Sequence, residues 1–324
     1  MHNFPVYSPE KLTEILLANK KSWHDNYLVM FSSIWGGFST FPPLWGVPPD
    51  DHMVHRADAV FESFKCLDGK AYCLEEHLER LKASAQALSL TFPSCFDNIR
   101  DILRQAYHLG NCKDITVRLT ISRGPGSFTV SPYDSKGPAL YLVTMKFMPA
   151  APELYERGIS LATSPFPAKS EYAGVKSCDY LHNVLAKKTA LDAGADYVVS
   201  FDQEGFLTEG ATENVAVITK DKRLVVPSFK RILKGVTLLR IMDLAQNLVA
   251  QGELKSVVNQ DMTKPQIQEE IEEAFITTTS FDVLGVYRWD DRLIGQGRPG
   301  PITKKIRQLI QEEQNRGLKS FDLN

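Results

Sequence analysis

The chain has 324 residues, of which 43% are hydrophobic and 23% charged, and its formal net charge is −2. These values are typical of a globular protein that is long enough for two domains with separate cores. A nearly neutral charge balance without a basic run argues against nucleic acid or an anionic membrane as the main partner. No apolar stretch approaches the ~20 residues that a membrane helix needs.

The first residues and the cysteines bear on the compartment. Residues 1–5 lack the basic and then apolar layout of a secretory signal. The five cysteines form an odd, scattered set without a Cys-x-x-Cys pair. Such a set suits free thiols in a reducing environment better than a disulfide framework, so we expect a cytoplasmic protein.

The first half of the chain predicts a mixture of helix and strand. Apolar residues at helical spacing predict an amphipathic helix over 74–89. Clean alternation predicts a strand with one polar face over 115–122, and a second strand follows over 140–147. Pro149 and Pro152 then interrupt the pattern, because neither residue can donate to a strand ladder. We therefore expect two domains, 1–148 and 149–324.

The second half predicts alternating strands and helices, with a final helix that begins near Pro301, a residue type suited to a helix start. The expected strands cover 195–201, 214–218, 223–226 and 274–279, and the expected helices about 180–193 and 237–251.

Lys176 is the first candidate site residue. It comes just before a predicted helix that Ser177 or Asp179 would cap. A lysine held beside apolar neighbours can lose its charge and become an amine nucleophile. The ordinary alternative is a solvated surface lysine. The other motifs of the chain decide between the two interpretations.

Glu209 lies in the segment 207–215, directly after a predicted hairpin turn at 201–205. A carboxylate fixed at a strand end can pair with a pyridinium nitrogen and keep it protonated. An exposed turn residue is the alternative interpretation.

Two further segments suit a phosphate group. Gly235 precedes the helix that starts at Val236 and Thr237, and free amides at a helix start bind phosphate. An ordinary capped helix is the alternative. Thr278 and Thr279 belong to a hydroxyl cluster at the end of a predicted strand, although a threonine-rich strand needs no function.

Taken together in chain order, these motifs resemble those of the fold-type IV enzymes that depend on pyridoxal 5'-phosphate (PLP), the class IV aminotransferase family. The resemblance covers nearly the whole chain, because residues 61–63 and 76–81 are similar to the family's N-terminal signature. Residues 32–37 and 50–56 look most like plant-type D-amino-acid transaminases, and 294–302 like that group and amine transaminases. The resemblance implies an α+β fold with a smaller N-terminal α/β domain, a larger C-terminal domain and a cofactor site between them. It also implies a homodimer.

The resemblance implies a role for each matching position. Lys176 matches the lysine that carries PLP as a Schiff base, and Glu209 matches the partner of the pyridine nitrogen. Arg80 matches the arginine on the cofactor phosphate, with a solvated helix arginine as the alternative. Tyr180 matches the tyrosine that bonds the ring hydroxyl in branched-chain enzymes, or it packs at the helix start. The remaining implied cofactor contacts are Gly235, Val236, Thr237, Thr278 and Thr279.

The expected substrate residues depart from the Bacillus-type D-amino-acid transaminases, which use an Arg-x-His pair in the loop after the polar-faced strand. This chain has Phe128 and Val130 at those positions. Arg118 lies on the polar face of its strand, and Arg56 stands where branched-chain enzymes have a tyrosine near the substrate. An arginine fork binds a carboxylate bidentately, so both are candidate clamps, with solvent-facing positions as the alternatives. Phe61 is a further expected substrate contact.

The resemblance implies transamination between an amino acid and a 2-oxo acid, both small-molecule partners, with a D-amino acid as the first expectation. A branched-chain aminotransferase is one alternative. The lyase that eliminates pyruvate from 4-amino-4-deoxychorismate is another, because it has a threonine where this chain has Ser63, although Glu62 looks more like a transaminase. A non-catalytic PLP-binding protein is the third. We expect no metal site, because no nearby cysteine or third histidine completes the pair His52 and His55.

Overall fold

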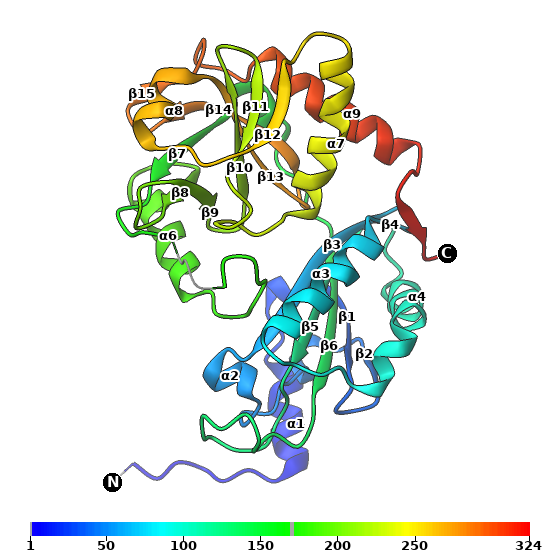
Figure 1. Cartoon of the computed structure of the whole chain (residues 1–324). Coiled ribbons are helices and arrows are strands. Elements are labelled where there is room, and N and C mark those ends of the chain that lie inside the picture. Colours follow the sequence, from blue (N-terminus) through cyan, green and yellow to red (C-terminus); the bar gives the residue numbers. More distant parts are fainter. Residues whose placement is uncertain (1, 169–171) are drawn as a thin grey trace. The chain divides into compact units, whose positions relative to one another are not determined.

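The computed structural model describes residues 2–168 and 172–324. The chain separates into two compact units (Figure 1). Unit 1 comprises Met1–Ala71, Ala85–Phe147 and Phe321–Asn324, and unit 2 comprises Tyr72–Ser84 and Met148–Ser320. Within the described residues, no helix is both long and apolar enough to cross a membrane.

The units differ from the expected domains 1–148 and 149–324 in two exchanged segments. The segment 72–84 belongs to unit 2, although it comes early in the chain. The Tyr72 hydroxyl donates to Glu313 Oε1 at 2.7 Å, and the Cys73 amide donates to the Lys319 carbonyl at 2.7 Å. Residues 321–324 join unit 1, where the Leu323 amide donates to the Gly69 carbonyl. Such long-range pairs leave no periodic signal, so the sequence alone missed both exchanges.

The sheet of unit 1 has the strand order β16-β4-β3-β5-β6-β1-β2. Its strands are β1 (Tyr27–Ser32), β2 (Gly37–Ser39), β3 (Ala59–Leu67), β4 (Lys70–Tyr72), β5 (Ile115–Ser122), β6 (Ala139–Lys146) and β16 (Ser320–Asp322). The helices that precede or follow them are α1 (Pro9–Ala18), η1 (Ser22–Asn26), η2 (Pro42–Leu44), α2 (His52–Arg56), α3 (Leu74–Ala87), η3 (Ser94–Asn98) and α4 (Ile99–Gly110). The expected helix over 74–89 corresponds to α3, which ends two residues earlier.

Strand β5 has the expected apolar face, but its polar face is accessible only in part. Its apolar residues, from Ile115 to Ile121, are fully buried. On the other face Arg118 is exposed and Thr116 half-buried, whereas Thr120 and Ser122 are buried. The Ser122 hydroxyl donates to the buried carboxylate of Asp51. Only the first part of β5 therefore presents a polar, accessible face.

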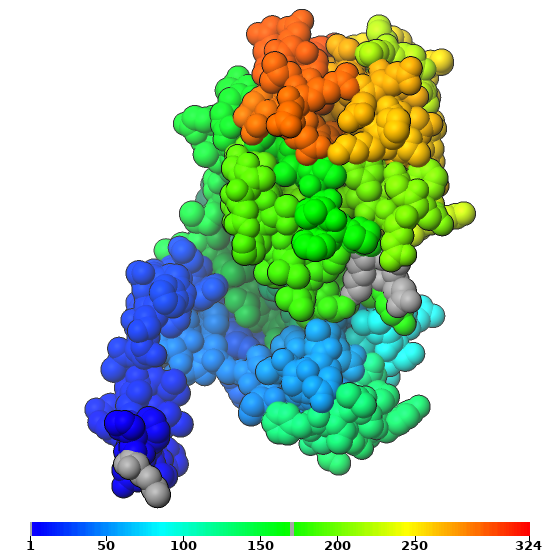
Figure 2. All heavy atoms as spheres, turned by 90° about the vertical axis from the view of Figure 1, so that its left-hand side faces the viewer, coloured from blue at the N-terminus to red at the C-terminus, as the bar shows by residue number. Residues whose placement is uncertain are grey.

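None of the residues of helix α1 is buried. Figure 2 shows the N-terminal segment as a dark blue projection at the lower left. Its side chains Leu12 and Leu17 are 47% and 46% exposed, so this helix adds little to the core of unit 1.

The sheet of unit 2 has the order β12-β11-β10-β13-β14-β7-β8-β9, and β15 pairs with β14. Its strands are β7 (Ile159–Thr163), β8 (Tyr197–Phe201), β9 (Leu207–Gly210), β10 (Asn214–Thr219), β11 (Arg223–Val226), β12 (Ser256–Asn259), β13 (Ile271–Thr278), β14 (Asp282–Trp289) and β15 (Arg292–Leu293). The helices are α5 (Pro152–Arg157), α6 (Leu181–Asp192), α7 (Val236–Ala250), α8 (Lys264–Glu270) and α9 (Pro301–Asn315). One apolar core lies between the sheet and the helices α7 and α9, with Phe275, Ile241 and Ile306 fully buried.

The structure places strands and helices where the second half predicted them, with shifted ends. Strand β13 begins at Ile271, three residues before the expected start, because Thr219 of β10 extends the pairing to it. The expected cap of α6 was wrong: Tyr180, rather than Ser177 or Asp179, occupies the N-cap position, and it makes no side-chain capping hydrogen bond.

Candidate active site

Glu209 lies on β9, at the end of the predicted hairpin. Strands β8 and β9 pair antiparallel, with Val199 opposite Gly210. The turn between them is held by Asp202, whose Oδ1 accepts the amides of Glu204 and Phe206 at 3.0 Å each. Gly205 has a φ of 82°, which a glycine adopts without strain. The local sequence therefore fixes Glu209 on a short, well-anchored strand.

The Glu209 carboxylate sits in an unusual electrostatic environment. Burial raises the pKa of Glu209 to about 8, although the hydrogen bond from the Leu233 amide and the positive charges of Lys176 and Arg80 oppose the shift. Both hydrogen bonds that it accepts within the described chain end on Oε2, from Asn214 Nδ2 at 2.8 Å and the Leu233 amide at 3.1 Å. A cationic group of a ligand placed at this carboxylate would favour its ionised form.

Asn214 connects Glu209 with the loop that leads into α7. Its Nδ2 also donates to the Leu233 carbonyl at 2.9 Å. A Cβ atom on Gly235 would lie only 1.9 Å from Asn214 Oδ1. Any other residue at position 235 would force the Asn214 side chain, which donates to Glu209, to shift.

The first turn of α7 offers an anion site. Gly235 is the N-cap and provides no side-chain hydrogen bond, so the amides of Val236 and Thr237 lie at an uncapped helix start. Arg80 of α3 reaches the same point, because its Nη1 donates to the Lys234 carbonyl at 3.0 Å. Uncapped amides, the helix dipole and a guanidinium together suit a phosphate group.

The hydroxyl groups of the threonine cluster have different surroundings in the structure. Thr278 Oγ1 accepts the amides of Ser280 and Phe281, at 3.1 and 3.4 Å, and holds the turn after β13. Thr279 is half-buried in that turn. Thr277 Oγ1, in contrast, is buried and has no hydrogen-bond partner in the described chain. Thr277 pairs in register with Asn214, so both side chains lie on one face of the sheet.

Lys176 lies in the segment before α6, close to the residues above. Its amide donates to Ser84 Oγ of α3 at 3.2 Å, and its Nζ lies 3.4 Å from the Tyr180 hydroxyl. Its charge also acts on the pKa of Glu209. The structure thus brings Lys176, Tyr180, Glu209 and Arg80 together within unit 2.

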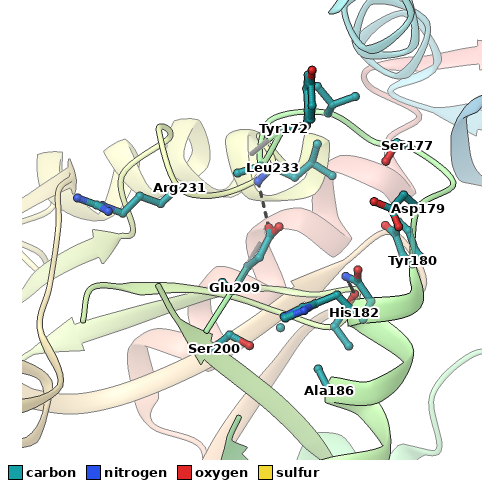
Figure 3. A pocket seen from close by; sticks show the side chains of 16 residues that line it. Tyr172, Ser177, Asp179, Tyr180, His182, Ala186, Ser200, Glu209, Arg231 and Leu233 are labelled. Atoms are coloured by element: carbon teal, nitrogen blue, oxygen red, sulfur yellow. Dashed lines mark hydrogen bonds between the residues drawn. The ribbon is translucent and has the colours of Figure 1, made fainter. Parts of the chain in front are cut away.

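A pocket adjoins these residues, and Figure 3 shows Tyr180, His182, Ser200 and Glu209 around it. His182 comes from the first turn of α6, and its Nε2 is buried without a hydrogen-bond partner in the described chain. The dashed line in Figure 3 marks the hydrogen bond from the Leu233 amide to Glu209.

These groups fit PLP. The unpartnered Thr277 hydroxyl, the uncapped start of α7 and Arg80 match the needs of a phosphate. Glu209 matches the needs of a protonated ring nitrogen, and Lys176 provides the amine.

In unit 1, Arg118 is an accessible cation on an aromatic platform. Its guanidinium lies 4.0 Å from the centroid of the Phe61 ring, and Phe61 itself is 4% exposed. Ser63 of β3 is paired with Arg118. Within the described residues no carboxylate forms a salt bridge with Arg118, so its fork is available to a carboxylate ligand. The Phe61 ring packs against the Arg118 guanidinium.

Arg56, the other candidate clamp, is engaged with the backbone. Its Nη1 and Nη2 donate to the carbonyls of His55 and Phe128, at 2.8 and 2.7 Å. The Phe128 side chain is 64% exposed.

His52 Nδ1 lies 3.3 Å from Asp58 Oδ2. Among the described residues, no group of three or more His, Cys, Asp or Glu side chains is arranged to hold a metal ion.

Three residues of the site escaped sequence reasoning as candidates: Asn214, Thr277 and His182. Asn214 opens an otherwise apolar strand, and that polar start was the available signal. Thr277 stood within the threonine cluster, but its lack of a partner is a three-dimensional fact. Nothing in the sequence distinguishes His182 from a surface histidine.

Comparison with known proteins gives the family. The model of the amino-transferase class IV family matches residues 59–289. The D-amino-acid transaminase, chloroplastic, of Arabidopsis thaliana is 35% identical over 317 residues, which cover 97% of this chain and 83% of the relative. A putative branched-chain-amino-acid aminotransferase of Methanocaldococcus jannaschii is 29% identical over 84% of this chain and 93% of its own length.

A solved structure agrees with the fold. A branched-chain amino acid aminotransferase of T.th., solved with pyridoxamine 5'-phosphate, superposes with a TM-score of 0.83 at 22% identity, covering 92% of this chain and 99% of the other. This likeness confirms the expected α+β fold of the fold-type IV enzymes. The family model and the plant relative together show that this chain belongs to the class IV aminotransferase family.

Proposed function

We propose that this chain moves an amino group between a D-amino acid and a 2-oxo acid, with PLP bound covalently to Lys176. The observation that carries the proposal is the convergence of Lys176, Glu209 and Arg80 within unit 2, where the charges of Lys176 and Arg80 both act on the Glu209 carboxyl. When bound, PLP supplies an electron sink for the bond broken at the amino acid's Cα.

The residues of the chain hold the cofactor by complementary contacts. The amides of Val236 and Thr237 and the Arg80 guanidinium bind the phosphate, and the Thr277 hydroxyl adds a donor. We also propose that Thr278 and Thr279, in the turn after β13, contact the phosphate. Gly235 permits the close approach of the backbone.

Two side chains act at the ring. Glu209 would keep the ring nitrogen protonated, because its partly buried carboxylate favours a positive charge on that nitrogen. Tyr180 contacts the ring hydroxyl from its place 3.4 Å from Lys176 Nζ. Once the amino group of the substrate has replaced Lys176 in the covalent bond to the cofactor, the freed Lys176 amine would take the proton from Cα and later give it back as a general acid.

The substrate carboxylate is assigned to Arg118. The Arg118 guanidinium packs on the Phe61 ring and is exposed to solvent. Arg56, in contrast, already donates hydrogen bonds to the carbonyls of His55 and Phe128. A D-amino acid is favoured because the plant relative, at 35% identity, is a D-amino-acid transaminase. Branched-chain amino acids are the alternative donors, in view of the archaeal relative.

The pyruvate-eliminating lyase is kept as a second candidate on one observation. Ser63 places a hydroxyl beside Arg118, its partner across β3 and β5, where the lyase resemblance has a threonine. One product assay separates the candidates. We would offer D-alanine, L-leucine and aminodeoxychorismate separately and measure the 2-oxo acid and the pyruvate released. Transfer from D-alanine to a 2-oxo acid supports the proposal, and pyruvate from aminodeoxychorismate without need of an acceptor overturns it.

We further propose a homodimer in the cytoplasm. The five cysteines are unpaired thiols, and Cys66 and Cys73 are buried. Burial raises the pKa of both thiols to about 12, which keeps them protonated and unreactive. The mass of the holoenzyme by light scattering tests the dimer.

A further inference from the structure

A second hollow of unit 2 lies along helix α9 and has a volume of about 300 Å³. We call it the α9 hollow, and the residues that line it include Tyr155 of α5 and Pro299, Lys304, Arg307 and Gln311 on or just before α9. No residue that we assign to the cofactor lines it. Its volume is at the lower end of the range found for small-molecule sites.

The walls of the α9 hollow are fixed by contacts at the start of the helix. The buried Glu273 carboxylate accepts the amides of Ile302 and Thr303, at 3.0 and 2.8 Å. Pro299 packs so closely on β14 that a Cβ atom on Gly285 would lie 2.7 Å from Pro299 Cβ. The start of α9 is therefore held against the sheet of unit 2, and the hollow is formed before any ligand arrives.

Arg307 is held in this hollow by an aromatic ring. Its guanidinium carbon lies 3.7 Å from the centroid of the Tyr155 ring, and the Tyr155 hydroxyl donates to the Phe281 carbonyl at 3.1 Å. A cation–π contact uses the face of the guanidinium and leaves the N–H donors at its edge unpaired. Within the described chain Arg307 forms no salt bridge or hydrogen bond, and its Nε is buried. The two Nη groups, which are not buried, are the donors that a ligand can reach.

The charges around the α9 hollow favour an anion. Lys304 lies three residues before Arg307, so both cations lie on the same side of α9. Glu156 is the acidic residue of the lining; it is exposed and forms no salt bridge with either cation in the described chain. Gln311 adds an amide donor. Two cations and one carboxylate leave the hollow with a net positive charge.

We propose that the α9 hollow binds a small anion that carries a carboxylate or a phosphate group. The anion accepts hydrogen bonds from the Arg307 Nη groups, and the Lys304 ammonium provides the second positive charge. A guanidinium fork matches two oxygens of either group, so the two kinds of anion share one chemistry at this site. This site goes beyond the proposed function and does not depend on it.

The test titrates the PLP-loaded protein, after removal of unbound cofactor, with inorganic phosphate and separately with succinate. Calorimetry in a low-salt buffer measures the affinity of wild type, Arg307→Gln and Lys304→Gln. Arg316→Gln, at an exposed position at the end of the same helix, is the matched control. Melting temperatures of all four proteins verify that the variants fold.

We expect wild type to bind at least one of the two anions with a Kd that is roughly millimolar. Arg307→Gln should bind it roughly tenfold more weakly, because charge-assisted hydrogen bonds are lost. Lys304→Gln should also weaken binding, whereas Arg316→Gln should bind like wild type. The anion with the higher affinity identifies the preferred group, phosphate or carboxylate.

Two results would overturn the inference: Arg307→Gln binding both anions as well as Arg316→Gln does, or wild type binding neither anion at ~10 mM. Either result would leave the proposed function standing, because the measurement does not involve turnover. A protein that takes up no PLP would instead refute the proposed function, and the comparison of Arg307→Gln with Arg316→Gln would still test the α9 hollow.

Discussion

The substitution Glu209→Gln tests the site at its most perturbed group. The change keeps the size of the side chain and an oxygen that can accept from Asn214 and Leu233. A neutral amide, however, cannot hold the pyridine nitrogen protonated, so proton removal at Cα should slow. Losing ~3 kcal/mol of transition-state stabilisation corresponds to a rate roughly two orders of magnitude lower.

The same variant makes a prediction about the protein without cofactor. Burial raises the pKa of Glu209 to about 8 from an ordinary value of 4.5, so the folded state binds the proton more tightly than the unfolded state. The stability from this proton is complete below the unfolded pKa and is lost as the pH rises through the folded pKa. Since one pKa unit corresponds to about 1.4 kcal/mol, wild type should lose on the order of 3 kcal/mol relative to the variant between pH 5 and 8.

Two assays check these expectations. Single-turnover kinetics with a D-amino acid give the rate of the chemical step, and urea unfolding of both cofactor-free proteins at pH 5 and pH 8 gives the stability difference. A near-native rate in the variant would show that Glu209 is not the partner of the ring nitrogen. Parallel stability changes in the two proteins across this pH range would show that Glu209 is already ionised at pH 5.

Further predictions follow from the other contacts. Arg80→Ala should weaken cofactor retention, so that activity after dialysis depends on added PLP, because the start of α7 loses its guanidinium; full activity after dialysis would contradict this. Thr277→Val should leave the melting temperature of the cofactor-free protein unchanged or raise it, because the buried hydroxyl has no partner in the described chain. The variant should bind PLP more weakly. A lowered melting temperature would reveal a structural hydrogen bond. Arg118→Leu should lower kcat/KM for amino acids roughly tenfold to a hundredfold, and much less for an amine without a carboxylate. Equal losses on both donors would move the clamp to Arg56.

Local patterns predicted many of the helices and strands. The hairpin at 202–206 and the glycine before α7 have local physical causes, namely a turn and a helix start, so the backbone around Glu209 and Gly235 could be predicted from the sequence. The roles of the two residues at a cofactor come from the family resemblance and stay predictions. What the sequence alone missed depends on pairs far apart in the chain. Asn214 donates hydrogen bonds to both Glu209 and the Leu233 carbonyl. The hydrogen bond from Tyr72 to Glu313 links the segment before α3 to helix α9 of unit 2.

The threonine cluster illustrates the limit on a smaller scale. Composition cannot tell which of three successive hydroxyls is already engaged. In the structure Thr278 holds the turn after β13, whereas the hydroxyl of Thr277 is buried and has no partner in the described chain. Strand alternation sends neighbouring side chains to opposite faces, so only the register of β13 with β10 identifies the residue beside Asn214.

The most direct test of the central claim is the covalent site of the cofactor. The purified protein, incubated with PLP, should be yellow, and borohydride should bleach the colour irreversibly. Peptide mapping should then find the pyridoxyl mass on Lys176, and Lys176→Ala should bind PLP without the covalent bond and lose turnover by orders of magnitude. A pyridoxyl label on another lysine, or a colourless protein after incubation, would contradict the account.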